Sequence, residues 1–276
     1  MMIAHLDAVA RIFKDGDPET VRLVKEQLIA GGHDNLRDLE ALAGSGDEEV
    51  CRHAREVVGE LTHREAEDDF DLYCRFFYDG CDIGIALWQL SEILGDRDLS
   101  AKGRKLLGQW GREFAVLASK AVSSRERVIA LSNFMAGELC FRGNSEDYYN
   151  PRNSLLGEVV ETRAGIPIAL VMVWRMVALR AGMIVDGINL PGHFIARHED
   201  VLFDPFHRGK ILTRADCARL LEKQGLQLRD CHLLPATPRQ TLVRMLANLL
   251  YSFDLRGETS KHDLVDRWLH LLCAET

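Results

Sequence analysis

A histidine and an aspartate stand in two short apolar runs of PGHFIARHEDVLFDPF, residues 191–206. A carboxylate that binds an imidazole fixes its tautomer and raises its basicity, and a nucleophile requires such a base. His193 and Asp204 therefore have the chemistry of two members of a catalytic triad. The same two residue types also form buried hydrogen bonds that only brace a hairpin, and the spacing alone favours this simpler interpretation.

The segments around the pair predict a β-hairpin. Residues 184–190, 193–198 and 201–206 have the length and apolar content of short strands. If Glu199–Asp200 forms a two-residue turn, His193 lies opposite Phe206. Because side chains alternate along a strand, Asp204 then shares a face with His193 and is its diagonal neighbour. A register slip of one residue would separate them.

Two side chains are candidates for the missing nucleophile. Cys140 stands in ELCFRGN, just before a loop, and Ser154 stands at the end of that loop. A small apolar residue at a helix end explains Cys140 equally well. Helix capping by Asn153 or Ser154 explains the serine. We therefore expect neither to be a nucleophile, although both remain alternatives.

A metal centre is the other chemistry that this region suggests. The plausible ligands are His193, His198, Asp204 and His207. However, His193 and His198 are separated by an odd number of positions and point to opposite faces of a strand. No spacing in the chain is typical of a zinc site. We expect no metal and no cofactor.

Composition indicates an ordinary globular protein with 47% hydrophobic residues and 28% charged residues. The net charge of −8 argues against a nucleic-acid partner. The most apolar segment, PIALVMVWRMVALRAG, is interrupted by Arg175 and Arg180, so no membrane span is expected. The N-terminus does not read as a secretion signal. The seven cysteines include no CxxC pair, which favours a reduced, cytoplasmic protein.

The first sixty residues contain a weak repeat. GDPETVRLVKEQL (16–28) aligns with GDEEVCRHAREVV (46–58), and each copy opens with an aspartate suited to cap a helix. Helix pairs of this period resemble HEAT-type repeats, although any pair of capped helices gives the same pattern. The acidic segment THREAEDDFD (62–71) is expected to be a solvated connector.

Helices are predicted over most of the remaining chain. Ser123 and Glu126 form a capping box, and Pro167 suits the first position of a buried helix over residues 166–181. The two arginines in that helix need carboxylate partners or an outlet to solvent, and Glu158 and Asp186 are candidates.

The loop before this helix brings donors, acceptors and rings together. With His193 and His207, they either line a concave pocket over the hairpin or cap helices and tie the loop down, and the sequence leaves both open. The loop residues concerned are Asn144, Tyr148, Tyr149, Arg152 and Asn153.

The order of these elements resembles the transglutaminase-like cysteine-peptidase core, in which a cysteine at a helix start precedes a histidine and an aspartate. More closely, the chain is similar to the SirB-type transglutaminase-like family. The resembling stretches are FRGNSEDYYNPRNSLLGEVVETRAGIPIAL, LPGHFIAR and LFDPFHRG. Residues 237–258 also resemble the first helix of a tetratricopeptide-type unit, and the chain then ends too soon for an array.

The expected fold is α+β and predominantly α, with a small antiparallel sheet packed on a buried helix. We expect a HEAT-like helical region at 1–64, a helical connecting region at 65–122, a transglutaminase-like core at 123–213 and C-terminal helices at 214–276.

The resemblance places His193 and Asp204 on the histidine and aspartate of the superfamily. Arg163 and Gly165 match the residues that precede its cysteine, but Pro167 occupies the cysteine position. The resemblance thus implies the fold without the usual chemistry. The expected function is regulatory binding of an unknown protein or peptide in the former active-site groove, to which Arg163 would also contribute. The alternative is an acyl-transfer or amide-hydrolysing enzyme that uses Cys140 or Ser154.

Overall fold

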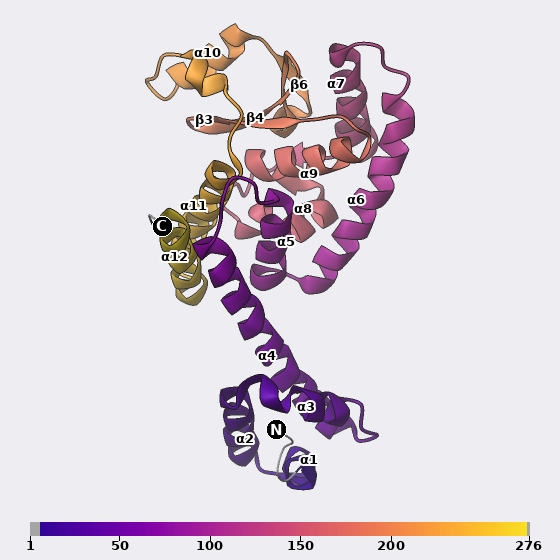
Figure 1. Ribbon diagram of the computed structural model, residues 1–276, viewed down its shortest axis with the longest axis vertical. Helices are drawn as coiled ribbons and strands as arrows, with labels where there is room; N and C mark the ends of the chain where they lie inside the picture. Colours follow the sequence, from indigo (N-terminus) through magenta and orange to yellow (C-terminus); the bar gives the residue numbers. More distant parts are fainter. Residues whose placement is uncertain (1–5, 275–276) are drawn as a thin grey trace. The chain divides into compact units, whose positions relative to one another are not determined.

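The computed structural model describes residues 6–274 and confirms an α+β fold that is mainly helical (Figure 1). The chain divides into two compact units, Met1–Asp69 and Phe70–Thr276. No helix between residues 6 and 274 is long and apolar enough to cross a lipid bilayer.

The first unit is helical. Its elements are α1 (Leu6–Asp15), α2 (Pro18–Ala30), a 3₁₀ turn (Gly32–Asn35), α3 (Leu36–Ala43) and the first part of α4 (Glu48–Arg75). Leu39, Ala54 and Val57, none more than 1% exposed, are at the centre of its apolar core.

The repeat in the sequence corresponds to a repeat of local contacts. Asp17 accepts hydrogen bonds from two backbone N–H groups at the start of α2, and Asp47 does the same at the start of α4, as predicted. Arg22 binds one glutamate three residues before it and another four residues after it, and Arg52 repeats this arrangement. These matched caps and ion pairs explain why the two segments look alike.

The segment at 62–71, expected to be a solvated connector, is exposed or half-buried at all but one position and contains the boundary between the two units, but it is helical. These residues lie inside α4, which runs without a break from Glu48 to Arg75. Charged residues with i,i+4 pairs, such as Arg64 with Glu60, stabilise an exposed helix as readily as they solvate a loop. The acidic composition therefore does not distinguish an exposed helix from a loop.

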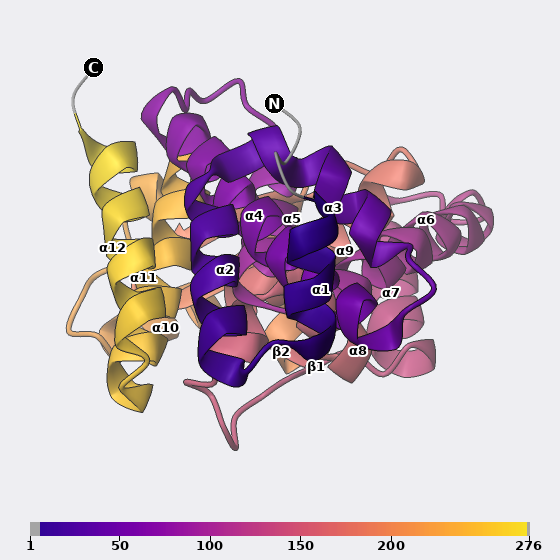
Figure 2. The ribbon, with the colours of Figure 1, turned by 90° about the horizontal axis from the view of Figure 1, so that it is seen from below.

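The second unit contains the site. Its helices are α5 (Ile83–Leu94), α6 (Arg97–Ala118), α7 (Ser124–Ser132), α8 (Leu156–Thr162), α9 (Pro167–Arg180), α10 (Arg214–Glu222), α11 (Pro238–Arg256) and α12 (Thr259–Cys273). Helical turns cover Asn133–Glu138 (π), Pro151–Ser154, Pro205–His207 and Asp230–Leu233. Figure 2 shows α11 and α12 side by side, and they pack against each other as a helical hairpin.

Helix α9 is the buried centre of this unit. Pro167 is its first residue, where the missing N–H costs nothing, and every residue from there to Trp174 is buried, as predicted. The helix packs against α6 and the strand β4, below the sheet in Figure 1.

The main sheet is antiparallel with the order β3 (Asp186–Leu190), β4 (His193–His198), β5 (Val201–Asp204) and β6 (Lys210–Leu212). Strand β6 is not predicted from the sequence because three residues carry too little pattern. A second, parallel pair joins β1 (Arg142–Gly143) to β2 (Ala164–Gly165) and fixes the loop before α9.

Candidate functional site

The hairpin of β4 and β5 positions the His–Asp pair. Glu199 and Asp200 form the expected turn, with Glu199 in the left-handed region at φ 52°. The register of the two strands brings His193 and Asp204 together, and His193 Nε2 lies 2.7 Å from Asp204 Oδ2. The predicted hydrogen bond is therefore present.

The expected pairing of His193 with Phe206 is wrong. Strand β5 ends at Asp204, because Pro205 has no N–H for the ladder and begins a short 3₁₀ turn. His193 pairs with Leu190 on the other side. The Phe206 ring instead lies edge-on to the imidazole, with 6.1 Å between centroids.

Asp204 is the most heavily bonded residue of the site. Its side chain is only 2% exposed, and Oδ1 accepts hydrogen bonds from the backbone N–H groups of Phe206 (3.0 Å) and His207 (3.4 Å). Burial alone would raise the pKa of this carboxyl. The hydrogen bonds and charges of His193 and His207 outweigh burial, so the pKa of Asp204 lies below its ordinary value of 3.8.

His207 is a second histidine that hydrogen-bonds to Asp204 Oδ2, the oxygen that His193 also contacts. Its Nδ1 lies 2.7 Å from Asp204 Oδ2, while 58% of its side chain remains exposed. An oxygen of an ionised carboxylate can accept two hydrogen bonds, so both imidazoles can donate at once. The carboxylate thus holds one half-buried ring and one ring at the surface.

Three of the four proposed metal ligands converge here. The donor atoms of His193, Asp204 and His207 lie within 4.8 Å of one another, and two imidazoles with one carboxylate are a donor set that suits divalent transition metals. His198 does not join them, since its Nδ1 lies 2.7 Å from the carbonyl oxygen of Ile184 on the other face. The absence of a metal stays a prediction.

Pro167 lies beside the histidine. Pro167, Ile168, His193 and Tyr148 line one small cavity of about 10 Å³, which is about the volume that one water molecule requires. The first residue of α9 therefore borders the same space as the imidazole that a thiol would need as its base. This proline has no group to exchange a proton.

The two alternative nucleophiles have other surroundings. The Cys140 thiol is exposed and lies 3.7 Å from the carbonyl oxygen of Gly137. Ser154 is buried in the turn before α8 but does not cap that helix, whose first flanking residue is Leu155. Within residues 6–274, His193 has no hydrogen bond to either residue.

Asn153 ties the loop down instead of capping α8. Its side-chain NH₂ donates to the carbonyl oxygens of Asp147 (2.6 Å) and Tyr148 (3.2 Å), and its Oδ1 accepts from Asn144 (3.0 Å). This arrangement is a brace of the loop, and it holds the ring of Tyr148 6.1 Å from that of Phe206. Asn153 and Asn144 thus position Tyr148 without facing His193 themselves.

The other proposed binding residues contact different partners. Arg152 donates to Glu158, at 2.6 Å for the shorter of two bonds, and Tyr149 packs against Tyr251. Arg163 is left-handed at φ 59° and stacks on Trp110, 4.2 Å from its centroid. Burial lowers the pKa of the Arg163 guanidinium. The structure does not bring these three side chains to the His–Asp pair.

A second, larger cavity next to His207 is not predicted from the sequence. It measures about 270 Å³ and is lined by Asp204, His207, Lys210, Leu212, Asp216, Arg219, Leu220 and Lys223. The charged residues at 216, 219 and 223 recur at the spacing of one helix face. The spacing could have indicated a charged helix face from the sequence. Only the folded structure shows that this face of α10 lies beside β6.

The His–Asp pair lies in a hairpin that packs on a buried helix, an arrangement that resembles a transglutaminase-like core. The family model for the transglutaminase-like superfamily matches residues 102–247, and the chain belongs to this superfamily.

Curated relatives include uncharacterised bacterial proteins. A UPF0162 protein of Xylella fastidiosa (strain 9a5c) is 36% identical over 133 residues, which cover 45% of this chain and 47% of that protein. The Pseudomonas aeruginosa UPF0162 protein is 31% identical over 178 residues, 63% of this chain and 65% of its own length.

A third relative is a mouse protein. F-box only protein 21 of Mus musculus is 28% identical over 157 residues, which cover 52% of this chain and 25% of that protein. The chain thus spans about half the length of the first Xylella relative (47%) and a quarter of the mouse protein (25%). No solved structure matches the chain.

Proposed function

We propose that this chain is a SirB-type, non-catalytic member of its superfamily that binds a protein or peptide segment at the His193–Asp204 site. The observation that carries the proposal is the shared cavity of Pro167 and His193. The imidazole is held by a buried carboxylate as a base would be, yet the residue beside it offers no nucleophile. The pair then serves to position His193 and the turn after Asp204.

The cavity beside His207 is the binding element in this proposal. Lys210 and Lys223 offer ammonium groups there, while the Asp216 carboxylate is already used by Arg219 (2.5 Å) and by the cap of α10. Leu212 and Leu220 supply apolar surface beside these charges. A segment with an acidic side chain next to an apolar one is complementary to this lining.

A labelled peptide with two adjacent glutamates between leucines tests the proposal by fluorescence anisotropy. We expect it to bind at least 10-fold more tightly than the matched glutamine peptide, because one good charge-assisted contact is worth about 1.4 kcal/mol or more. Replacing Lys210 and Lys223 together by glutamine should remove this preference. Lys102→Gln is the control, since Lys102 pairs with Glu161 on another surface.

Mass spectrometry of the same mixtures separates binding from catalysis. The proposal predicts that both peptides remain intact. Release of ammonia from the glutamine peptide, lost in His193→Ala, would instead establish the acyl-transfer alternative. Equal binding of the two peptides would refute the role of the lysines.

The N-terminal unit is a second contact surface in this proposal. Its matched helix caps and ion pairs support a HEAT-like relation between α2 and α4. Such helices expose one face to partners while the other packs on the neighbouring repeat.

A further inference from the structure

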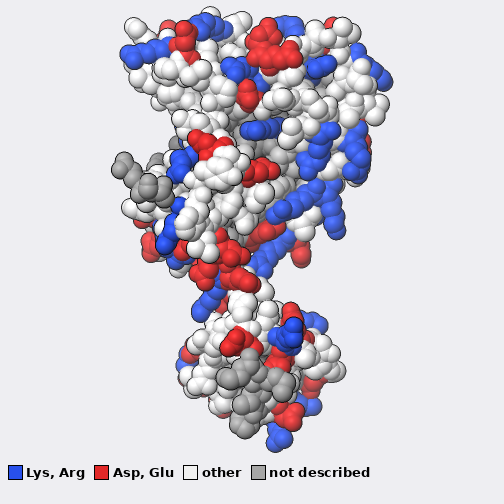
Figure 3. Space-filling view, viewed as in Figure 1, with Lys and Arg blue, Asp and Glu red and all other residues white. Residues whose placement is uncertain are grey.

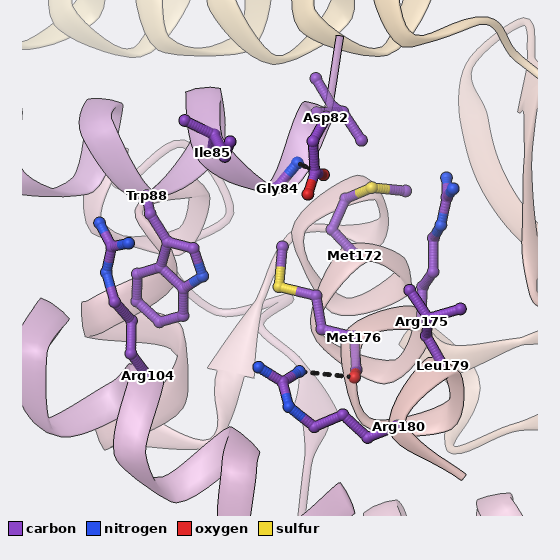
Figure 4. Close-up of a pocket in the computed structure, with 11 residues that line it drawn as sticks. Asp82, Gly84, Ile85, Trp88, Arg104, Met172, Arg175, Met176, Leu179 and Arg180 are labelled. Atoms are coloured by element: carbon purple, nitrogen blue, oxygen red, sulfur yellow. Dashed lines mark hydrogen bonds between the residues drawn. The ribbon is translucent and has the colours of Figure 1, made fainter. Parts of the chain in front are cut away.

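A larger cavity lies at the other end of α9. It measures about 380 Å³ and is formed by α5, α6 and the C-terminal half of α9, all within the second unit (Figure 4). This volume lies in the range of small-molecule sites, roughly 300–1,000 Å³. The His–Asp site, by contrast, lies at the N-terminal end of the same helix.

The walls of this cavity are apolar and adaptable. Figure 4 shows Trp88 and Met176 facing each other, with Met172 above Met176 in this view. Methionine side chains adjust to irregular ligands. Ile85 and Leu179 also line the cavity and remain 51% and 57% exposed, so apolar surface continues to its rim. An apolar ligand body would cover this surface.

Three arginines line the same cavity, and the two carboxylates that were candidate partners for Arg175 and Arg180 bind other residues. Glu158 binds Arg152, and Asp186 binds Arg197, so neither of these carboxylates serves α9. The arginines in question are Arg104, Arg175 and Arg180.

The arginines keep donors available for a ligand. The side chain of Arg175 has no hydrogen bond or ion pair within residues 6–274. Arg180 donates one N–H to the carbonyl oxygen of Met176 (2.8 Å), which leaves four of its five donors. Figure 4 shows its guanidinium directed toward the space between Trp88 and Met176. Arg104 binds Glu92 (2.6 Å) and lies 5.2 Å from the Trp88 centroid.

The lining of the cavity is therefore cationic, whereas the whole chain has a net charge of −8. The one acidic residue in its lining, Asp82, uses its carboxylate to accept a hydrogen bond from Gly84 N (2.8 Å) at the start of α5. Lys and Arg side chains also gather over α6 on the face drawn in Figure 3.

We infer that this cavity binds a small amphipathic carboxylate. Its aliphatic or aromatic body lies between Trp88 and the two methionines, and its carboxylate accepts hydrogen bonds from Arg180, with Arg175 adding positive charge to the lining. Planar guanidinium groups match carboxylates in geometry, and apolar walls strengthen such bonds. This site is independent of the function proposed for His193.

Isothermal titration calorimetry with octanoate tests this inference, with octanol as the uncharged probe. We expect one octanoate per chain and weaker binding of octanol. Arg180→Gln should weaken octanoate at least 10-fold and leave octanol unchanged, whereas Met176→Trp should fill the cavity and abolish both. Arg125→Gln on α7 is the matched control, and His193→Ala should bind octanoate like the unmodified chain.

Three results would overturn the inference. One is the lack of saturable octanoate binding. The second is binding that survives Met176→Trp, which would place octanoate elsewhere. The third is equal affinity of octanoate for the Arg180→Gln variant and the unmodified chain, which would show that the cavity does not recognise the carboxylate. Circular dichroism of each variant establishes that it is folded.

Discussion

Asp204→Ala should lower the free energy of unfolding by about 4 kcal/mol, because it removes a buried carboxylate and leaves the donors that it accepts from without a partner. The carboxylate is 2% exposed and accepts hydrogen bonds from His193, His207 and two backbone N–H groups. Urea denaturation measures the loss. Asp254→Ala, the same change on the exposed surface of α11, should leave the midpoint unchanged.

The effect of this substitution should depend on pH with a definite sign. Since the folded-state pKa of Asp204 lies below the ordinary value of 3.8, the carboxylate stabilises the fold fully above that value. This contribution is lost as the pH falls through the lower folded-state pKa. The unmodified chain and the alanine variant should therefore converge in stability at acid pH. A difference that grows below pH 3.8 would contradict the assigned hydrogen bonds.

Pro167→Cys should create a thiol that is far more reactive than any natural cysteine of the chain. A thiol at the start of a helix and beside a histidine has a pKa well below the usual ~8.5. Its thiolate fraction at pH 6 should therefore be about 100-fold higher than that of an ordinary cysteine. Pro167 has both features, as the first residue of α9 and a neighbour of His193. Residue-resolved iodoacetamide labelling gives the rate, with the exposed Cys140 as the internal reference.

The double variant with His193→Ala is the control for this experiment. Removing the imidazole should lower the labelling rate of the new cysteine at pH 6 until it is close to the labelling rate of Cys140. If the rate at the new cysteine does not change, His193 does not act on the first residue of α9, and the comparison of Pro167 with the cysteine position fails. Pro167→Ala reports whether losing the proline perturbs the fold.

The features predicted correctly depend on local signals. The caps at Asp17 and Asp47, the proline at the start of α9 and the two-residue turn at Glu199–Asp200 all follow from residues within a few positions of each other. The hydrogen bond between His193 and Asp204 followed because a tight turn determines the register of its hairpin.

The features that were missed depend on contacts between distant segments. Asn153 had the composition of a helix cap, but its partners lie in the loop before it, and only the folded loop shows this. The bond of His207 to the same carboxylate as His193 was not predicted, because it depends on the 3₁₀ turn that begins at Pro205 and brings His207 back toward Asp204. The cavity lined by Arg180 involves three helices, so no single stretch of sequence reveals it.

We claim that the His–Asp pair has no nucleophile to serve, and acyl trapping on the unmodified chain decides whether it does. The chain is incubated with an activated acyl ester, and adducts are located by peptide mass spectrometry, with His193→Ala in parallel. We expect any labelling of the exposed cysteines, Cys140 included, to be the same in both proteins. An adduct on Cys140 or Ser154 that disappears in His193→Ala would contradict the claim and make this protein an enzyme.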